Sequence, residues 1–233
     1  MKYHTIDRPS SGFSLLHDHL SGLMAKTLAN AYMKDTSGRY LAANASQVER
    51  SGMHTHHALI GATDHDLVWK ACADILIKHD QHVILKREAT IFIEPVNLNR
   101  SVDASQDHSY LSYKSPLLDA NGGVIGVYGF SYLLDESLSI NQIFDELALI
   151  IGKHGIHYAK MLISRHRLVS SSLTTRQLDC LKLLAKGMTM KQIGVSLGLS
   201  SRTVEHYLEA VKSKLKCGTR AEMIGVALEL GFE

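Results

Sequence analysis

The sequence predicts an α+β protein: an antiparallel sheet with helices, then a connector helix, then a C-terminal domain made only of helices. Two pairs of β-rich runs flank a helical stretch between residues 30 and 136. Apolar residues then recur at helical spacing, and no proline follows Pro116. These patterns predict an N-terminal helical extension, a sheet domain, a connector and a C-terminal domain, at residues 1–29, 30–136, 137–169 and 170–233.

Charge is distributed unevenly along the chain. Residues 165–233 hold 11 Lys or Arg against 6 Asp or Glu, whereas the rest of the chain holds 14 against 17. A basic module beside an acidic one is typical of a phosphate-binding domain joined to a domain with another task. The cysteines, Cys72, Cys180 and Cys217, lack the spacing of a disulfide framework or a zinc ribbon, so we expect a reducing, cytoplasmic setting. No apolar run has the length of a membrane span, so no membrane partner is expected.

The N-terminal part predicts two hairpins around a central helix. In chain order, the expected elements are a helix at 12–30, a hairpin of 31–34 with 39–43, a helix at 69–86, a strand at 90–96 and a hairpin of 110–118 with 124–132. Asp35 and Gly38 favour the first turn, and Asn121 with Gly122 favours the second.

Residues 139–168 predict a long connector helix. Ser139 and Gln142 have the spacing of a capping box, whereas Gly152 and Gly155 weaken the helix in its middle. A heptad-like seam contains Ile140, Ile143, Leu147, Ile150, His154, His157 and Met161. This seam either covers the sheet or pairs two copies and passes a signal, and the sequence leaves both open. Residues 170–172 predict a short flexible link.

The most informative stretch is 200–216, which predicts a helix with two chemically different faces. One face carries the apolar stripe Val204, Leu208, Val211 and Leu215, and the opposite face carries Arg202, His206, Glu209 and Ser213. A shorter helix precedes it at 189–197, with a capping box of Thr189 and Gln192. Gly198 suits the bend and Ser200 the next N-cap, so the unit predicts two helices joined by a tight turn, of which the second fits a major groove.

Residues 173–224 resemble the LuxR-type four-helix DNA-binding domain over nearly its full length. The matching positions are Leu173, Thr174, Arg176, Gly187, Lys191, Ile193, Leu197, Ser200, Thr203, Val204, Lys214 and Leu215. Three positions differ from the family's usual residues: Gln177 replaces Glu, Gly194 replaces Ala and Tyr207 replaces His. Gln177 can still complete a capping box with Thr174. The resemblance implies a bacterial, sequence-specific transcription regulator that binds double-stranded DNA and works with RNA polymerase.

The second helix of this unit provides the candidate DNA contacts. Arg can bridge guanine and Glu can accept from cytosine N4, so base-edge contacts are expected from Arg202, Glu205, His206 and Glu209. Backbone contacts, which set register, are expected from Thr174, Thr189, Lys191, Ser200, Thr203, Tyr207, Lys212 and Lys214. Residues 219–230 place Met223, Val226, Ala227 and Leu230 on one side, for the core and for dimerisation. A two-fold homodimer predicts an inverted-repeat DNA site.

Residues 30–134 resemble a PAS sensor domain. The positions that carry this resemblance are Asp35, Gly38, Asn44, the run 59–69, Lys114, Pro116 and residues 122–126. It implies a pocket for a small molecule, a cofactor or a partner, which the sequence does not identify. Two other input domains fit worse: an acyl-homoserine-lactone domain normally has several Trp, whereas this chain has only Trp69, and a phosphoacceptor receiver needs acidic residues in a pattern that is not visible.

The histidines leave alternatives open. His79 or His82 could bind haem in a redox or gas sensor, although no cofactor is expected. His54, His56 and His57 lack a Cys or acidic partner at metal-ligand spacing. The C-terminal helices could also form a sigma-region-like protein-interaction module. The sequence contains no phosphate loop or nucleophile elbow, so an enzyme is not expected.

Overall fold

The computed structural model describes residues 27–97, 107–134 and 139–232. The helix expected at 12–30 therefore lies almost wholly outside the described residues, and residues 27–29 are not helical because β1 begins at Asn30. The elements in chain order are β1 (Asn30–Asp35), β2 (Tyr40–Ala43), α2 (Ala45–Ser51), α3 (His56–Leu59), the 3-10 turns η1 (Asp64–Asp66) and η2 (Lys70–Cys72), α4 (Ala73–Lys86), β3 (Thr90–Asn97), β4 (Asp107–Leu118), β5 (Val124–Leu133), α5 (Ile140–Ser172), α6 (Thr175–Ala185), α7 (Met190–Leu197), α8 (Ser201–Lys214) and α9 (Arg220–Glu229).

The chain separates into two compact units. One contains β1, β2, β5, the second part of β4 and helices α2 to α4. The other contains the segments Ile91–Val96 and Asp107–Leu111 and the chain from Leu134 onward. In the described part of the chain, no helix combines the length and the apolar character needed to cross a bilayer.

The β-strands form one five-stranded sheet in the order β2-β1-β5-β4-β3, in which β1 pairs antiparallel with both β2 and β5. Both predicted hairpins are therefore confirmed. In the first turn, Asp35 Oδ1 accepts from the amides of Ser37 and Arg39, both at 2.9 Å, and Gly38 is left-handed with φ 77°. This local chemistry places the β1–β2 turn where the sequence predicts it.

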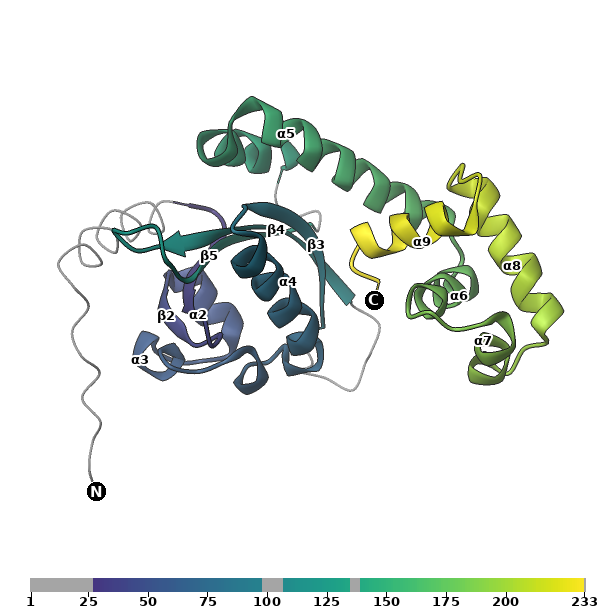
Figure 1. The fold of residues 1–233 in the computed structure, drawn as a ribbon, viewed down its shortest axis with the longest axis horizontal. Helices are drawn as coiled ribbons and strands as arrows, with labels where there is room; N and C mark the ends of the chain where they lie inside the picture. Colours follow the sequence, from purple (N-terminus) through teal and green to yellow (C-terminus); the bar gives the residue numbers. More distant parts are fainter. Residues whose placement is uncertain (1–26, 98–106, 135–138, 233) are drawn as a thin grey trace, which may run out of the picture. The chain divides into compact units, whose positions relative to one another are not determined.

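Helix α4 covers one face of the sheet and contacts β5, while α2 packs against β1 (Figure 1). Asn44 caps α2 by accepting from the Gln47 amide, and its side chain also bonds to the backbone of Ala29 and Ala31. The helix predicted from Trp69 instead begins at Ala73, because residues 70–72 form the tighter turn η2. The apolar face of α4 turns toward the sheet and buries Leu76 and Val83.

The connector is the long helix α5, broken at one residue. Gly152 has φ 67° and ψ −179°, a conformation outside the helical region that glycine adopts readily, so two helical segments meet there. The predicted capping box at Ser139 is wrong, since its side chain caps no amide. The predicted link at 170–172 is also wrong: these serines continue α5, with the Ser171 and Ser172 hydroxyls donating to carbonyls of the preceding turn.

The seam residues of α5 do not share one environment. Ile143 and Leu147 are buried within the single chain, whereas His157 is exposed and the side chain of His154 lies outside the described residues. Beyond Gly152 the buried face continues at helical spacing through Ala159, Leu162, Ile163 and Val169. Packing within one chain therefore accounts for the burial of Ile143 and Leu147.

The C-terminal domain is the four-helix unit α6 to α9. Its core combines residues from all four helices: Cys180, Leu181, Leu184, Ile193, Val204, Leu208, Val211, Met223 and Ala227. The apolar stripe predicted for the second helix of the turn is buried at its first three positions, and Leu215 is half-buried at its end. Both predicted capping boxes are present, Thr174 with Gln177 and Thr189 with Gln192.

Candidate nucleic-acid interface and buried charge cluster

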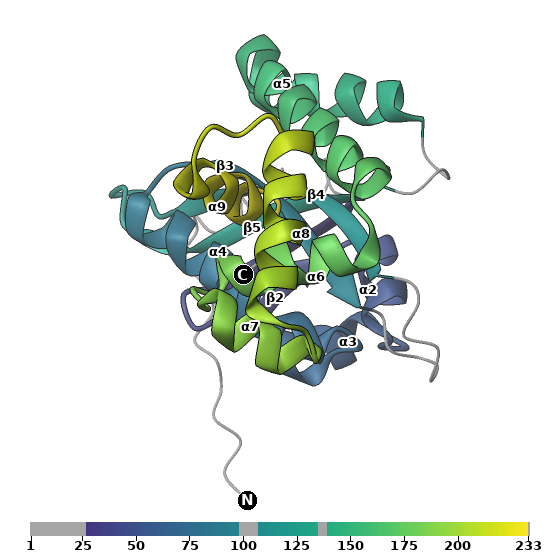
Figure 2. The same cartoon turned by 90° about the vertical axis from the view of Figure 1, so that its right-hand side faces the viewer.

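Helices α7 and α8 are joined by a tight turn (Figure 2). Gly198 ends α7 in the left-handed conformation, and its amide donates to the Gly194 carbonyl. A Cβ on the buried Gly194 would lie 2.6 Å from the Leu199 carbonyl oxygen, so the helix and the turn approach each other closely. Ser200 then caps α8 by accepting from the Thr203 amide at 3.0 Å. These contacts fix the angle between the two helices of the turn.

The outward face of α8 carries the four predicted base contacts. All four are exposed: Arg202, Glu205, His206 and Glu209. Within the described part of the chain, Arg202 and Glu205 make no hydrogen bond or ion pair, and Glu209 faces Lys212 at 3.8 Å. The His206 ring lies edge-on to the Tyr207 ring. The face therefore presents donors and acceptors that are available to a partner.

Three of the predicted backbone contacts are N-cap residues. The side chains of Thr174, Thr189 and Ser200 each accept from an amide one turn into their helix, so the hydroxyl oxygens are already engaged. They place the positive ends of α6, α7 and α8 at the surface, where phosphate oxygens can bind to amides that have no helical partner. Of the other candidates, Lys191 is exposed, and Thr203, Tyr207 and Lys212 are half-buried.

Lys214 differs from the other predicted backbone contacts. Its Nζ donates to the Ser172 carbonyl oxygen at 2.7 Å and to Gln177 Oε1 at 2.8 Å. Lys214 is an exposed residue, but its amine is bound at the junction of α5 and α6, which the sequence pattern did not predict.

Most of the residues predicted to serve the core and dimerisation lie in the core. Met223, Ala227 and Leu230 are buried in the C-terminal domain itself, because the apolar side of α9 packs against α6. They cannot contribute surface to a pair of intact domains. Val226 is half-buried, and Leu228, which the prediction omitted, is 44% exposed.

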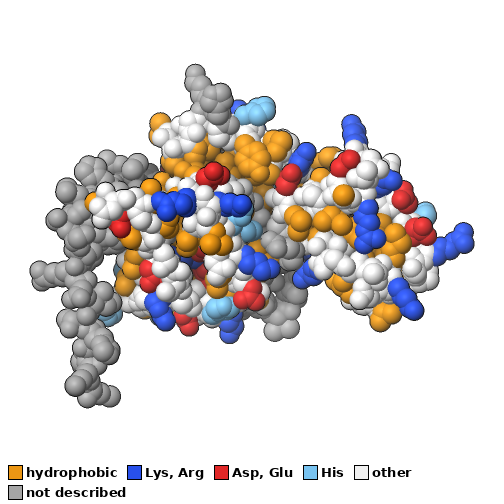
Figure 3. Space-filling model, viewed as in Figure 1, with side chains coloured by type: hydrophobic (Ala, Val, Ile, Leu, Met, Phe, Trp, Pro, Cys, Tyr) orange, Lys and Arg blue, Asp and Glu red, His pale blue; other side chains and the backbone are white. Residues whose placement is uncertain are grey.

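Basic side chains are spread over the visible face of the α6–α9 domain, with carboxylates between them (Figure 3). Four exposed basic residues were not among the predicted contacts: Arg176, Lys186, Lys216 and Arg220. Arg220 also donates to the Met188 carbonyl oxygen at 3.3 Å, which joins the start of α9 to the α6–α7 turn. The charge asymmetry of the sequence was the available signal for these residues.

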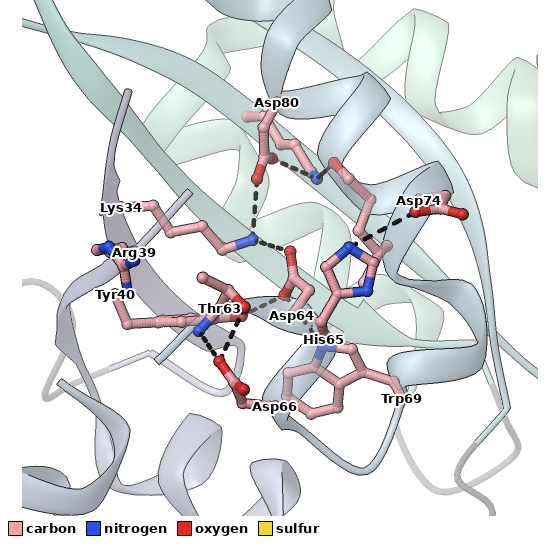
Figure 4. A network of polar contacts seen from close by, with 12 residues as sticks. Lys34, Arg39, Tyr40, Thr63, Asp64, His65, Asp66, Trp69, Asp74 and Asp80 are labelled. Carbon is pink, nitrogen blue, oxygen red and sulfur yellow. Dashed lines mark hydrogen bonds and ion pairs between the residues drawn. The ribbon is translucent and has the colours of Figure 1, made fainter. Parts of the chain in front are cut away.

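The sheet domain contains a second polar arrangement, a buried charge cluster of Lys34, Asp64, Asp80 and Lys114 (Figure 4). Lys34 Nζ lies 2.5 Å from Asp64 Oδ2 and 2.9 Å from Asp80 Oδ2. Lys114 Nζ lies 2.7 Å from Asp80 Oδ1 and 3.3 Å from the Leu76 carbonyl oxygen. Two positive and two negative charges alternate, so the buried cluster is close to neutral.

Neutral donors complete the surroundings of Asp64. The Tyr40 hydroxyl and the Trp69 indole N–H both donate to Asp64 Oδ1, at 2.9 Å and 3.0 Å. Burial acts to raise the pKa of Asp64, but the Lys34 charge and the hydrogen bonds from Lys34 and Trp69 outweigh it and lower the pKa. For Lys34, burial acts to lower the pKa, and the charges of Asp80 and Asp64 raise it above its ordinary value. The geometry therefore keeps both groups ionised inside the protein.

The predicted histidine alternatives fall in different places. His79 is buried on α4 and His82 is exposed on the same helix, while His54, His56 and His57 are exposed. Within residues 27–97, 107–134 and 139–232, no group of three or more His, Cys, Asp or Glu side chains is arranged to hold a metal ion. The described geometry offers nothing that favours a metal centre.

Comparison with known families decides between the readings of the two domains. Residues 171–227 match the family of bacterial regulatory proteins described as luxR, and residues 26–137 match the PAS fold. The chain contains a PAS domain followed by a LuxR-type helix-turn-helix domain. Both resemblances stated from the sequence are confirmed, and the haem and sigma-region alternatives are not favoured.

Curated relatives match the LuxR-type domain alone. The HTH-type quorum sensing-dependent transcriptional regulator VjbR of Brucella ovis is 41% identical over 64 residues, which cover 28% of this chain and 25% of the relative. The transcriptional activator protein ExaE of Pseudomonas putida is 39% identical over 60 residues, which cover 26% and 28%. The chain thus spans about a quarter of the length of these relatives.

Solved structures extend the likeness of the fold to both domains. A structure of VqmA bound to DPO covers 92% of this chain and 88% of its own, with TM-score 0.50 and 22% identity. A structure of the Vibrio cholerae VqmA dimer in the absence of target DNA covers the same shares, with TM-score 0.52 and 21% identity. At these identities the likeness concerns the fold alone: a PAS domain followed by a LuxR-type domain.

Proposed function

We propose that this protein is a bacterial, sequence-specific DNA-binding transcription regulator whose PAS domain senses a signal and controls the LuxR-type domain. The observation that carries the proposal is the outward face of α8, where exposed side chains with hydrogen-bonding groups follow a capped, tightly packed turn. A helix of this kind fits the major groove of DNA. There its exposed side chains contact the base edges, while its apolar side chains stay in the protein core. The match to the luxR family supports the same conclusion.

The proposed contacts divide by chemistry. Arg202, Glu205, His206 and Glu209 read base edges, because they lie on the exposed side of α8. The backbone contacts set register and comprise Lys191 with Thr174, Thr189, Ser200, Thr203, Tyr207 and Lys212. The exposed N-caps support this division, since helix N-termini bind phosphate. Bound at a promoter, such a protein changes the access or recruitment of RNA polymerase.

The regulator is proposed to act as a homodimer. One of the solved structures with the same fold is described as a VqmA dimer, and two-fold pairing matches two half-sites of an inverted repeat. In this chain, Val226 and the exposed Leu228 of α9 are the apolar candidates for the contact between LuxR-type domains. Sedimentation analysis with and without DNA measures the number of chains.

The PAS domain, proposed to span residues 30–136, responds to a small molecule, a cofactor or a partner. The buried charge cluster favours a polar small molecule, because a group that enters this part of the core must exchange hydrogen bonds with charged side chains. VqmA is described as bound to DPO, a ligand of that protein. Native mass spectrometry of protein purified from its own cells identifies the bound molecule and the number of subunits together.

Selection of duplexes from a pool of random sequence tests the DNA-binding function. We expect the full chain to enrich an inverted repeat, with an affinity that falls as salt rises. Replacing Lys191 by Ala should weaken binding to all duplexes and lower the salt slope by about one. Lys86→Ala, which removes the same charge from the exposed end of α4, is the matched control and should leave the slope unchanged.

Arg202→Ala separates base reading from phosphate binding. If Arg202 reads a base, its removal changes preference at one position of the enriched site by about 1 to 3 kcal/mol. An equal loss on every duplex would show that Arg202 only binds phosphate. A pool from which the wild-type protein enriches no sequence, with no retardation in dilute buffer, would contradict the proposed function as a whole.

A further inference from the structure

Lys214 lies in the last turn of the proposed DNA-reading helix α8, but its amine is occupied within the protein. The Nζ atom donates to the carbonyl oxygen of Ser172, the last residue of the connector helix α5, at 2.7 Å. It also donates to Gln177 Oε1 in the first turn of α6, at 2.8 Å. One side chain thus joins the end of α8 to the junction between α5 and α6.

The chemistry of this junction suits a cation. The last carbonyls of an α-helix have no amide partner in the helix and carry the negative end of its dipole. Ser172 supplies such a carbonyl at the end of α5. Gln177 is held in place as well: it is only 8% exposed, and its Oε1 accepts from the Thr174 amide at 3.1 Å. The Lys214 amine therefore binds to acceptors that are already oriented.

A lysine that binds phosphate has a different environment. Lys191 and Lys214 are both exposed residues, but within the described residues the Lys191 amine makes no hydrogen bond or ion pair. Two of the three N–H donors of the Lys214 ammonium are engaged, and moving the amine away from the junction to a phosphate would break both hydrogen bonds. This loss makes Lys214 a poor phosphate ligand and a good internal tie.

A second contact joins α5 to the other end of the LuxR-type domain. The Arg165 guanidinium forms an ion pair with the Glu229 carboxylate at the end of α9. The connector is thus bonded to α8 at Ser172 and to α9 at Arg165, from positions two turns apart. Helix α8 is held at its N-terminus by the turn after α7 and at its C-terminus by the connector.

We infer that Lys214 is a positioning residue, which transmits the position of the connector helix to the DNA-reading helix instead of binding phosphate. The inference rests on the proposed function, since it assigns a route by which the sensor controls α8. A displacement of the end of α5 moves the Ser172 carbonyl and, through Lys214, the C-terminal end of α8. The exposed side chains of α8 then change their angle to the groove while the N-cap at Ser200 stays in place.

The test compares Lys214→Met with Lys191→Ala in the full chain, on a labelled duplex enriched by the wild-type protein. A lost internal tie weakens binding about tenfold at every salt concentration and leaves the salt slope unchanged. A lost phosphate contact lowers the slope by about one, as expected for Lys191→Ala. A slope lowered by one in Lys214→Met would overturn the inference.

Hydrogen–deuterium exchange without DNA provides the second readout. The Leu173 and Thr174 amides should exchange faster in Lys214→Met, because the junction loses the amine that orders it, and should not change in Lys191→Ala. Lys214→Arg keeps a cationic donor and should restore both protection and affinity in part. Unchanged exchange in Lys214→Met would contradict the tie. If no duplex is enriched, the proposed function fails while exchange still measures the tie.

Gln177→Glu keeps the inference testable if Lys214→Met does not fold. A carboxylate at this position should strengthen the bond to Lys214 and slow exchange at the junction. The same change combined with Lys214→Arg should give a smaller effect, since the fork of Arg does not reproduce the position of the ammonium group. An equal effect in both backgrounds would show that position 177 and the Lys214 amine are not coupled.

Discussion

The PAS domain and the LuxR-type domain use charged residues in opposite ways. In the PAS domain, the buried charge cluster places two lysines and two aspartates inside the core, each within 2.9 Å of a partner of opposite type. In the LuxR-type domain, the core cluster is apolar, and among the described residues of that domain Gln177 is the buried polar side chain, at the start of α6. Its charged residues lie on the surface, where a ligand can reach them.

This difference determines which residues of each domain can be substituted without loss of the fold. Buried charges tolerate rearrangement only if every partner is replaced, so a cluster of this kind specifies one arrangement of β1, η1, α4 and β4. An apolar core with capped helices leaves the surface free, and the exposed face of α8 can vary without loss of the fold. In the PAS domain the buried residues are therefore the most constrained. In the LuxR-type domain the surface residues can change while the core keeps the fold.

Removing one charge from the cluster should produce the largest effect. Asp80→Asn keeps the shape of the side chain but takes a negative charge from between Lys34 and Lys114. We expect the free energy of unfolding to fall by about 3 to 5 kcal/mol, because buried lysines lose a carboxylate partner. Denaturant unfolding followed by fluorescence of Trp69, the single Trp of the chain, measures it.

The matched control is Asp74→Asn on the same helix. Its carboxylate lies 3.6 Å from His65 at the surface, where a lost ion pair changes stability little. Equal losses in the two variants would show that burial of the cluster contributes nothing special.

Acid should sharpen the comparison between the domains. The pKa of Asp64 is lower in the folded protein than in the unfolded chain, where a carboxyl titrates near pH 3.9, about its ordinary value. Its stabilising contribution is complete above that pH and is lost as the pH falls through the folded value. We expect the PAS domain to lose stability below about pH 4, while the LuxR-type domain changes less. Trp69 fluorescence reports the former and exchange of the α6–α9 amides the latter; coincident acid transitions would contradict the difference.

Substitution of Gly194 tests how closely α7 packs against the turn in the LuxR-type domain. Gly194→Ala would place a Cβ 2.6 Å from the Leu199 carbonyl, and a backbone atom cannot yield cheaply. We expect a loss of about 1 to 3 kcal/mol in the free energy of unfolding, which exceeds the gain in helix propensity. Gly225→Ala in α9 meets nothing within 4 Å and should stabilise the domain by up to about 1 kcal/mol. Thermal unfolding of both variants measures this difference in stability. Equal shifts of the midpoint temperature in the two variants would contradict the prediction.

The smallest expected effect concerns a helix end. Ser200→Ala removes the oxygen that accepts from the Thr203 amide, and N-cap losses of this kind cost about 1 kcal/mol. Ser213→Ala, on an exposed position of the same helix, should change stability by only a few tenths of a kcal/mol. Circular dichroism during denaturant unfolding distinguishes the two variants. Similar midpoints would show that the Ser200 cap does not stabilise α8.

The parts predicted correctly from sequence depend on neighbours along the chain. The turn at Asp35, the capping boxes of α6 and α7 and the stripe of α8 are set by residues within a few positions, so their patterns are visible without the fold. The predicted start of α4 and the predicted end of α5 were wrong, because other local structures compete with the pattern on which each prediction was based. A 3-10 turn replaces the first turn of α4, and serine hydroxyls return to carbonyls of α5.

The buried charge cluster could not be predicted in the same way. Lys34 meets Asp64 across 30 residues and Asp80 across 46, so no local pattern contains the pair. A weak signal was present, since Lys34 follows the apolar run 31–33 in a predicted strand. The direction of the Lys214 amine also depends on the fold, because Ser172 lies 42 residues earlier in the chain.

Gly152 limits how far a rotation can travel along the connector. An α-helix resists torsion through its continuous ladder of backbone hydrogen bonds, and φ 67° with ψ −179° interrupts that ladder. Twisting the segment before residue 152 about its own axis therefore does not turn the segment after it by the same angle. The part of α5 after Gly152 can therefore change its direction separately from the part before it. Its C-terminal end carries the Ser172 carbonyl, so a bend at Gly152 would displace that carbonyl.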